Sequence, residues 1–163
     1  MKSSQNIPQK IFTKEALLQE VMRWRLKNKK IVFTNGVFDI LHTGHIASLH
    51  EAASHGDVLI IGLNSDASVK RLKGTARPVN PQDARALLLA SLLVTDAIVI
   101  FDEDTPRDLI VSVMPDVLVK GGDYTVDTIA GANFVTGYGG SVEIIPFVEG
   151  YSTSSVIANI KKL

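Results

Sequence analysis

The sequence predicts an α/β protein in which helices cover both faces of one parallel sheet. Two observations indicate this class. Short runs of consecutive apolar residues, typical of buried strands, alternate along the chain with amphipathic helical segments. Turn-forming residues separate the two kinds of segment. Together they predict a Rossmann-like, three-layer α/β/α domain with a five-stranded parallel sheet, which would bind its ligand at the carboxyl ends of the strands.

Five segments have the composition of buried strands. The first is apolar and β-branched and ends at Asn35 and Gly36, and the second contains the aliphatic run from Val58 to Ile61. The other three have similar runs of Val, Ile, Leu and Phe. The expected strands are residues 31–34, 57–63, 97–101, 116–119 and 142–145.

Seven further segments have helical patterns. In the first, apolar residues from Leu17 to Trp24 recur near one face, and Thr13 is a candidate N-cap. A later segment, rich in Ala and Leu, follows Pro81, which suits a first helical turn. The expected helices are 13–28, 44–54, 65–72, 82–93, 106–113, 128–136 and 152–161. Residues 1–12 are polar and predict a loose tail.

The length and composition narrow the class of protein. A chain of 163 residues predicts one domain, over 31–163, preceded by a tail and helix over 1–30. The 17 basic and 17 acidic side chains cancel, so we expect neither nucleic acid nor a membrane as partner. The absence of cysteine excludes disulfides and thiolate chemistry. With no signal-peptide pattern and no apolar run of about 20 residues, we expect a cytoplasmic protein.

The segment from Thr34 to His45, TNGVFDILHTGH, carries the strongest chemical signal. It joins the first predicted strand to the next helix, where helix-terminal N–H groups favour anions. His42 and His45 flank Gly44, and their N–H groups can donate to phosphate oxygens as charge develops. A metal site is the alternative, although the adjacent Glu of the metalloprotease helix motif is missing. His50 and His55 read as surface residues.

A basic segment follows the second predicted strand. Lys70, Arg71, Lys73 and Arg77 occur within eight residues without an acidic residue among them. They form either a phosphate clamp on a loop or a solvated charged face. Arg85 lies near the start of the next helix, where a position on the helix surface is one interpretation.

Two motifs near the end of the chain complete the candidate site. Lys120 to Tyr124, KGGDY, follows the fourth predicted strand, and its paired glycines allow a ligand to approach closely. Asp123 could form a turn through an Asx hydrogen bond. Gly150 to Ser155, GYSTSS, precedes the last helix, where hydroxyls cap the helix and can also contact phosphate.

TNGVFDILHTGH resembles the signature of the HxGH nucleotidyltransferases, which include glycerol-3-phosphate cytidylyltransferase and phosphopantetheine adenylyltransferase. Further motifs resemble one branch, the D-glycero-D-manno-heptose 1-phosphate adenylyltransferases, across about residues 31–161. These motifs are NSDASV, RLKG, RPVNP, DTP, PDVLVKGGDY and VEGYSTS. In many bacteria this branch forms the C-terminal half of a protein with a sugar kinase in front. This chain is similar to the stand-alone form, so we expect a separate kinase.

The resemblance implies transfer of AMP from ATP to the heptose 1-phosphate, giving ADP-heptose and pyrophosphate for lipopolysaccharide core biosynthesis. It implies Mg²⁺ bridging the phosphates, with no metal ligand assigned in the protein, and a homo-oligomer, either a dimer or a larger assembly. Two alternatives remain open. One is the same chemistry with CTP and glycerol-3-phosphate, or with GTP and a heptose phosphate. The other is a non-catalytic nucleotide-binding sensor domain.

The resemblance also implies roles for individual residues. Arg77 and Arg85 would contact substrate phosphate, and Asp39 would orient the loop, help to hold the metal ion or cap the helix. The wider superfamily has an arginine where this chain has Ile157, which cannot bind phosphate. The implied catalytic residues are His42, His45 and Lys73. The implied nucleotide-binding residues are Thr34, Asn35, Gly36, Val37, Phe38, Asp39, Gly44, Lys120, Gly121, Asp123, Tyr151, Ser152, Thr153 and Ser154.

Overall fold

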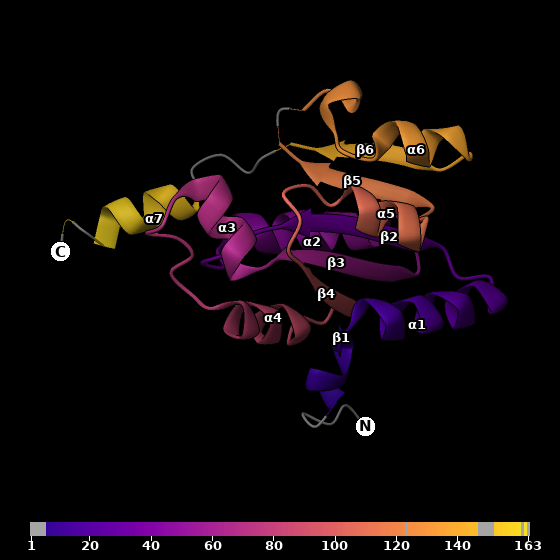
Figure 1. Ribbon diagram of the computed structural model, residues 1–163, viewed down its shortest axis with the longest axis horizontal. Coiled ribbons are helices and arrows are strands. Elements are labelled where there is room, and N and C mark those ends of the chain that lie inside the picture. Colours follow the sequence, from indigo (N-terminus) through magenta and orange to yellow (C-terminus); the bar gives the residue numbers. More distant parts are fainter. Residues whose placement is uncertain (1–5, 123, 147–151, 161, 163) are drawn as a thin grey trace.

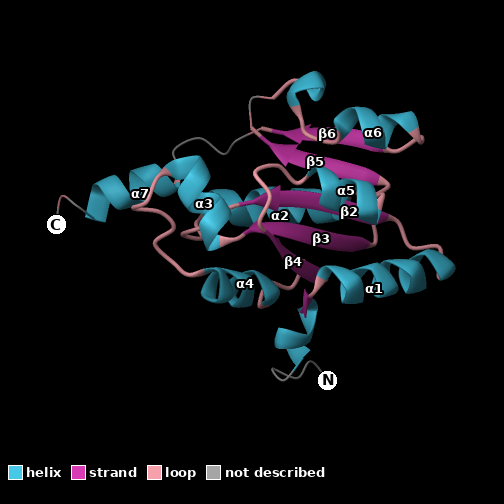
Figure 2. Ribbon diagram, in the orientation of Figure 1, coloured by secondary structure: helices cyan, strands magenta, loops and turns pink. Residues whose placement is uncertain are grey.

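A six-stranded parallel sheet with helices on both faces forms the centre of the computed structural model (Figures 1 and 2), which describes residues 6–122, 124–146, 152–160 and 162. The strand order is β1-β4-β3-β2-β5-β6, and every adjacent pair is parallel. The order reverses between β2 and β5, and such a switch point is where open α/β sheets bind ligands. The strands are β1 Ile11–Phe12, β2 Ile31–Gly36, β3 Val58–Asn64, β4 Ala97–Phe101, β5 Val117–Gly121 and β6 Ser141–Ile145.

The parallel α/β class is confirmed, but the expectation of five strands is wrong. The additional strand is β1, within the segment that the sequence predicts to be a loose tail. Ile11 pairs with Ile98 and Phe12 with Val99, so the chain adds an edge strand beside β4. The amine of Lys10 donates to the carbonyl of Thr95 at 2.6 Å and fixes the same segment. Two residues are too few to show a strand period, so the pattern gave no signal.

Each of the seven predicted helices is present, with shifted ends. The largest shift concerns α6, which begins at Ala132 because Gly131, at φ 86°, forms its N-cap and residues 126–128 form a separate 3-10 turn. The helices are α1 Lys14–Leu26, α2 Thr43–Ser54, α3 Asp66–Lys73, α4 Gln82–Ala90, α5 Arg107–Val113, α6 Ala132–Gly137 and α7 Thr153–Ile160, with 3-10 turns η2 Pro8–Lys10 and η3 Val126–Thr128. Within the described ranges, no helix combines the length and hydropathy that crossing a bilayer requires.

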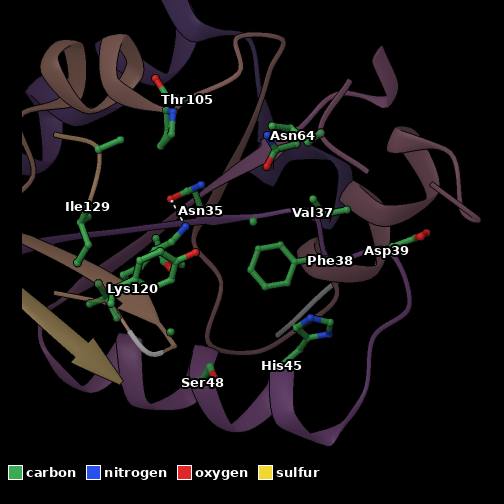
Figure 3. Close-up of a pocket in the computed structure, with 18 of the residues that line it drawn as sticks. Asn35, Val37, Phe38, Asp39, His45, Ser48, Asn64, Thr105, Lys120 and Ile129 are labelled. Atoms are coloured by element: carbon green, nitrogen blue, oxygen red, sulfur yellow. Dashed lines mark hydrogen bonds between the residues drawn. The ribbon is translucent and has the colours of Figure 1, made fainter. Parts of the chain in front are cut away.

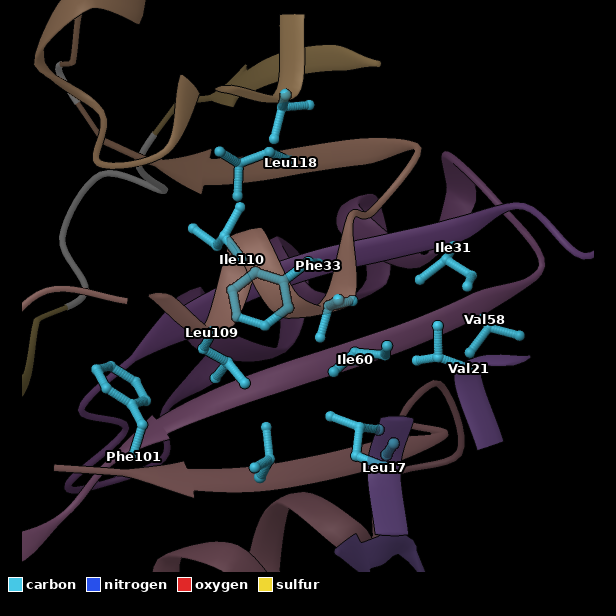
Figure 4. Packing of buried hydrophobic residues seen from close by; sticks show 14 of the residues in the cluster. Leu17, Val21, Ile31, Phe33, Val58, Ile60, Phe101, Leu109, Ile110 and Leu118 are labelled. Carbon is cyan, nitrogen blue, oxygen red and sulfur yellow. The ribbon is translucent and has the colours of Figure 1, made fainter. Parts of the chain in front are cut away.

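Two apolar clusters cover the two faces of the sheet, because successive side chains of a strand point to opposite faces. On one face, Phe33 and Ile60 pack with residues of α1 and α5 (Figure 4). On the other face, Val32 and Ile61 pack with residues of α2 and α4. Helix α2 therefore approaches the carboxyl edge of the sheet from one side and α5 from the other.

Helix α1 belongs to this core although it precedes β2. Leu17 has no exposed surface and packs in the same cluster as Phe33 and Ile60. Thr13 caps the helix, since its hydroxyl accepts from the amide of Ala16 at 3.2 Å. The helix is therefore anchored both at its start and along its buried face.

We predict that Leu17→Ala lowers the free energy of unfolding by about 2–5 kcal/mol, because it leaves a cavity in a packed core. Leu26→Ala is the control: Leu26 lies on the same helix with 85% of its surface exposed, so its change should stay within about 0.5 kcal/mol. Urea denaturation measures both. Equal values for the two variants would show that α1 does not contribute to the core.

Candidate active site

A cavity of about 480 Å³ lies at the carboxyl ends of the strands, where the strand order reverses (Figure 3). β2, β3 and β5 supply its floor, and α2, the end of α3 and the loop after β4 supply its walls. The structure brings twelve of the sequence-predicted site residues to this one cavity. They are Thr34, Asn35, Gly36, Val37, Phe38, Asp39, His45, Lys73, Arg77, Lys120, Gly121 and Thr153.

His42 and His45 stack at the start of α2, with ring centroids 3.8 Å apart. His42 is the N-cap, and its Nδ1 accepts from the amide of His45 at 3.4 Å. Since Nδ1 accepts, the neutral ring of His42 carries its proton on Nε2. His45 lines the cavity, and the ring of Phe38 meets it edge-on with centroids 5.2 Å apart.

The environment keeps both imidazoles uncharged near neutral pH. Burial, and secondarily the neighbouring His42, lowers the pKa of His45 to about 4. Burial also lowers the pKa of His42. A backbone hydrogen bond with Ile40 acts in the opposite direction and raises the pKa of His45, but burial outweighs it. The Nδ1 atom of His45 is buried and has no hydrogen-bond partner within the described residues.

The loop between β2 and α2 has a constrained backbone. Phe38 has φ 46°, a left-handed conformation that is uncommon for an aromatic residue. A Cβ on Gly36 would lie 2.8 Å from the Phe38 ring, so a larger residue there would displace the ring from this position. This turn directs the Phe38 ring toward His45 (Figure 3).

Asp39 holds a second loop against the signature segment. Its carboxylate is 1% exposed and accepts from Arg77 Nε at 2.6 Å and from the amides of Val79 and Asn80 at 2.8 and 2.9 Å. Burial alone would raise the pKa of Asp39, but these donors lower it below its usual value. Of the alternatives for this residue, the geometry fits the loop-orienting role, because both oxygens already have donors.

Arg85 does not take the phosphate-binding position that the resemblance implies. Its side chain has no exposed surface and is absent from the cavity lining. It donates to the carbonyl of Val37 at 2.6 Å, to the carbonyl of Asn80 at 3.0 Å and to Asp66 at 2.7 Å. The three hydrogen bonds compensate the cost of burying the guanidinium, and they join the two loops. Contact with a phosphate would require these hydrogen bonds to break.

The basic segment divides into two roles. Arg71 forms ion pairs with Asp104, at 2.7 Å, and with Asp102, at 3.7 Å, so it joins α3 to the loop after β4. Lys73 and Arg77 line the cavity, and Lys73 is close enough to contribute to the lowered pKa of His45. The cavity therefore gains positive charge on the side of the histidines.

Lys120 is a third cation at the cavity. Burial lowers its pKa, and its amine donates to Asn35 Oδ1 at 3.2 Å and lies 5.5 Å from the centre of the Tyr124 ring. Within the described part of the chain, no carboxylate pairs with this amine. A buried ammonium without an anionic partner is costly, so an anionic ligand would stabilise it.

The other predicted site residues in α2 and near α7 do not line the cavity or lie outside the described residues. Gly44 is buried in α2, and Ser152 and Ser154 lie beside Thr153 without lining the cavity. Ser152 and Ser155 instead exchange hydrogen bonds at the start of α7. Asp123 and Tyr151 fall outside the described residues.

Sequence reasoning missed several lining residues. The most informative are Ser48, Asn64, Thr105 and Ile129, each labelled in Figure 3. Asn64 ends β3 beside β2, so the rule that ligands bind at carboxyl ends of strands could have found it. Ser48 and Ile129 could be identified only from the three-dimensional structure, because packing brings α2 and the segment after η3 to the edge of the sheet.

The described residues contain no group of three or more His, Asp or Glu side chains that could hold a metal ion. Asp39, the one carboxylate in the signature, is fully occupied by protein donors. The magnesium ion bridging the substrate phosphates therefore stays a prediction.

The fold and site define a nucleotide-binding type of α/β domain, with a histidine-capped helix start and cations at the switch point of a parallel sheet. The model of the cytidylyltransferase-like family matches residues 33–159. The chain therefore belongs to the cytidylyltransferase-like family, and the expected membership of the nucleotidyltransferase superfamily is confirmed.

Relatives and solved structures agree with this assignment. The chain is 54% identical over 88% of its length to the bifunctional protein HldE of Hyphomonas neptunium, and 51% identical over 91% to that of Koribacter versatilis. It spans only 30% of each of these relatives. A lipopolysaccharide core biosynthesis protein from Thermoplasma volcanium is 29% identical over 76% of this chain and 99% of its own, with a TM-score of 0.59. A pantoate-beta-alanine ligase from Francisella tularensis, 15% identical over 93% of this chain and 76% of its own, shares the fold with a TM-score of 0.62.

We predict that the imidazole of His45 stays neutral until the pH falls well below 6. An unfolded histidine protonates near pH 6.5, whereas this folded one does so near pH 4. The contribution of His45 to stability is therefore complete above pH 6.5 and is lost as the pH falls from there toward 4. NMR titration of the ring signals, assigned with His45→Gln, measures the midpoint. A midpoint above pH 6 would contradict the buried, neutral histidine.

Proposed function

We propose that the chain transfers AMP from ATP to D-glycero-D-manno-heptose 1-phosphate, releasing pyrophosphate and forming ADP-heptose for lipopolysaccharide core biosynthesis. The observation that carries the proposal is the stacked histidine pair at the start of α2, of which His45 lines the cavity together with Lys73. The family assignment supports nucleotidyl transfer. The branch motifs, the identity of about half to the HldE proteins and the lipopolysaccharide protein of known structure support the heptose phosphate as acceptor.

In this mechanism the triphosphate group of ATP lies against the start of α2. The first amides of a helix have no intrahelical acceptors and attract anions. Gly44 adds no side chain there, and it is buried against the core. The Nε2–H of His42 and the ring of His45 act beside these amides as neutral donors. Neutral donors suit a phosphate whose charge grows only in the transition state, because they do not overstabilise the bound substrate.

The reaction itself is a displacement at phosphorus. An oxygen of the sugar phosphate attacks the α-phosphorus of ATP, the bond to the bridging oxygen breaks, and pyrophosphate leaves. No covalent enzyme intermediate is required, so the chain acts by alignment and charge neutralisation. Lys73 and Arg77 neutralise the leaving pyrophosphate, and Lys120, from the neighbouring strand β5, neutralises the attacking phosphate. Mg²⁺ bound to the triphosphate would supply further charge neutralisation at the phosphate oxygens.

Measuring pyrophosphate release for each pair of a nucleoside triphosphate and a sugar phosphate tests this function. We predict that pyrophosphate release is fastest with Mg-ATP and the heptose 1-phosphate, because the branch motifs accompany the catalytic histidines. The assignment of ATP and the heptose 1-phosphate as substrates would be wrong if this pair released no pyrophosphate. It would then be replaced by CTP with glycerol-3-phosphate, or by GTP with the heptose phosphate, whichever pair released pyrophosphate. Binding of ATP without turnover on any sugar phosphate would identify a sensor domain instead.

We predict that His45→Ala and His42→Ala each lower kcat by about 10²–10³-fold, as expected for the loss of one donor to developing charge. His50→Ala is the matched control, because His50 is an exposed residue of the same helix, and its kcat should be unchanged. Circular dichroism separates chemistry from folding, since His42 also caps α2. Nearly normal turnover in both site variants would exclude the histidine pair from the mechanism.

A further inference from the structure

A row of polar side chains crosses the sheet on the side of the cavity opposite to α2. Phe33, Ile60 and Leu118 belong to the cluster that packs against α1 and α5. Strand alternation then directs Asn35, Asn64 and Lys120, each an even number of residues further along its strand, to the same face. The hydrogen bond from Lys120 to Asn35 agrees with this placement. In Figure 3, Asn64 and Thr105 lie on one side of Asn35, and His45 and Ser48 lie on the other.

Asn64 is held with its amide oxygen toward the cavity. Its side chain is buried, with 4% of the residue exposed, and its Nδ2 donates to Ser68 Oγ at 3.0 Å. The hydroxyl of Ser68 donates its own proton to the carbonyl of Glu103 at 3.1 Å. Ser68 Oγ must therefore accept from Asn64, which fixes the orientation of the amide. The Oδ1 atom faces the cavity (Figure 3) and receives no hydrogen bond from any described residue.

Thr105 completes this wall from the loop between β4 and α5. It lines the cavity, and its side chain is exposed. The ion pair of Arg71 with Asp104 and the hydrogen bond of Ser68 with Glu103 hold the loop beside α3. The wall therefore presents a fixed carbonyl oxygen and a hydroxyl. Asp104, the neighbour of Thr105, also lines the cavity, and its carboxylate is paired with Arg71.

We propose that Asn64 and Thr105 form the subsite that binds the hydroxyl groups of the acceptor sugar and so select the acceptor. The proposal rests on the proposed function and adds the residues that distinguish one acceptor from another. A carbonyl oxygen accepts from a sugar hydroxyl but repels phosphate oxygens, so this wall does not suit the triphosphate. The phosphate of the same acceptor then lies toward Lys120, between this wall and the histidines.

Steady-state kinetics with separate variation of the two substrates test the subsite. Asn64→Ala and Thr105→Val should each raise the KM for the heptose 1-phosphate about tenfold, which corresponds to one lost hydrogen bond. The KM for ATP and the affinity for a non-hydrolysable ATP analogue should not change. Asn133→Ala, at an exposed position on α6, is the control and should leave both KM values as they are.

The outcomes separate the two proposals. If the unaltered chain does not turn over the heptose 1-phosphate, the proposed function fails and the subsite fails with it. If it does, but the variants change the KM for ATP or neither KM, the subsite alone is overturned. Circular dichroism monitors folding of Asn64→Ala. Should that variant unfold, Thr105→Val decides, because an exposed threonine can be replaced by the isosteric valine without loss of the core.

Discussion

Two buried charged side chains determine where the site loops lie. Asp39 accepts from Arg77 and from the amides of Val79 and Asn80, while Arg85 donates to the carbonyls of Val37 and Asn80. Each charge would be costly to bury alone. Each is satisfied by backbone groups together with one oppositely charged side chain, which is Arg77 for Asp39 and Asp66 for Arg85. The same contacts join the loop that precedes α2, at Val37 and Asp39, to the loop that contains Arg77 and Asn80. They therefore hold Arg77 near the start of α2.

This arrangement explains how a chain with no net charge can hold a polyanionic substrate. Lys73, Arg77 and Lys120 line one cavity. Of the two acidic partners of Arg71, Asp102 is not among the lining residues, whereas Asp104 lines the cavity with its carboxylate paired to Arg71. Burial lowers the pKa of both histidines, and the neighbouring His42 lowers that of His45 further, so both rings favour the neutral form. Fixed cations thus carry the ground-state charge, and neutral N–H donors remain for the charge that develops during the reaction.

The sequence predicted most of the fold because long apolar strands and capped helices have strong periodic patterns. It missed β1 because two residues show no period, and it misplaced Arg85 because burial of an arginine depends on three acceptors from distant segments. The sequence could not distinguish the role of Arg71 from that of Lys73. The fold distinguishes them, because it brings Asp104, in the loop after β4, to Arg71. Asn64 begins the NSDASV motif, and its position at the end of β3 was a second signal that it could belong to the site.

The structure supports binding of the nucleotide on the α2 side of the cavity and of the acceptor on the side of Asn64. A crystal structure with magnesium and a non-hydrolysable ATP analogue tests this division most directly. The account predicts the triphosphate at the start of α2, within hydrogen-bond distance of His42 and His45 and beside Lys73. A triphosphate bound instead against Asn64 and Thr105, away from the histidines, would contradict it.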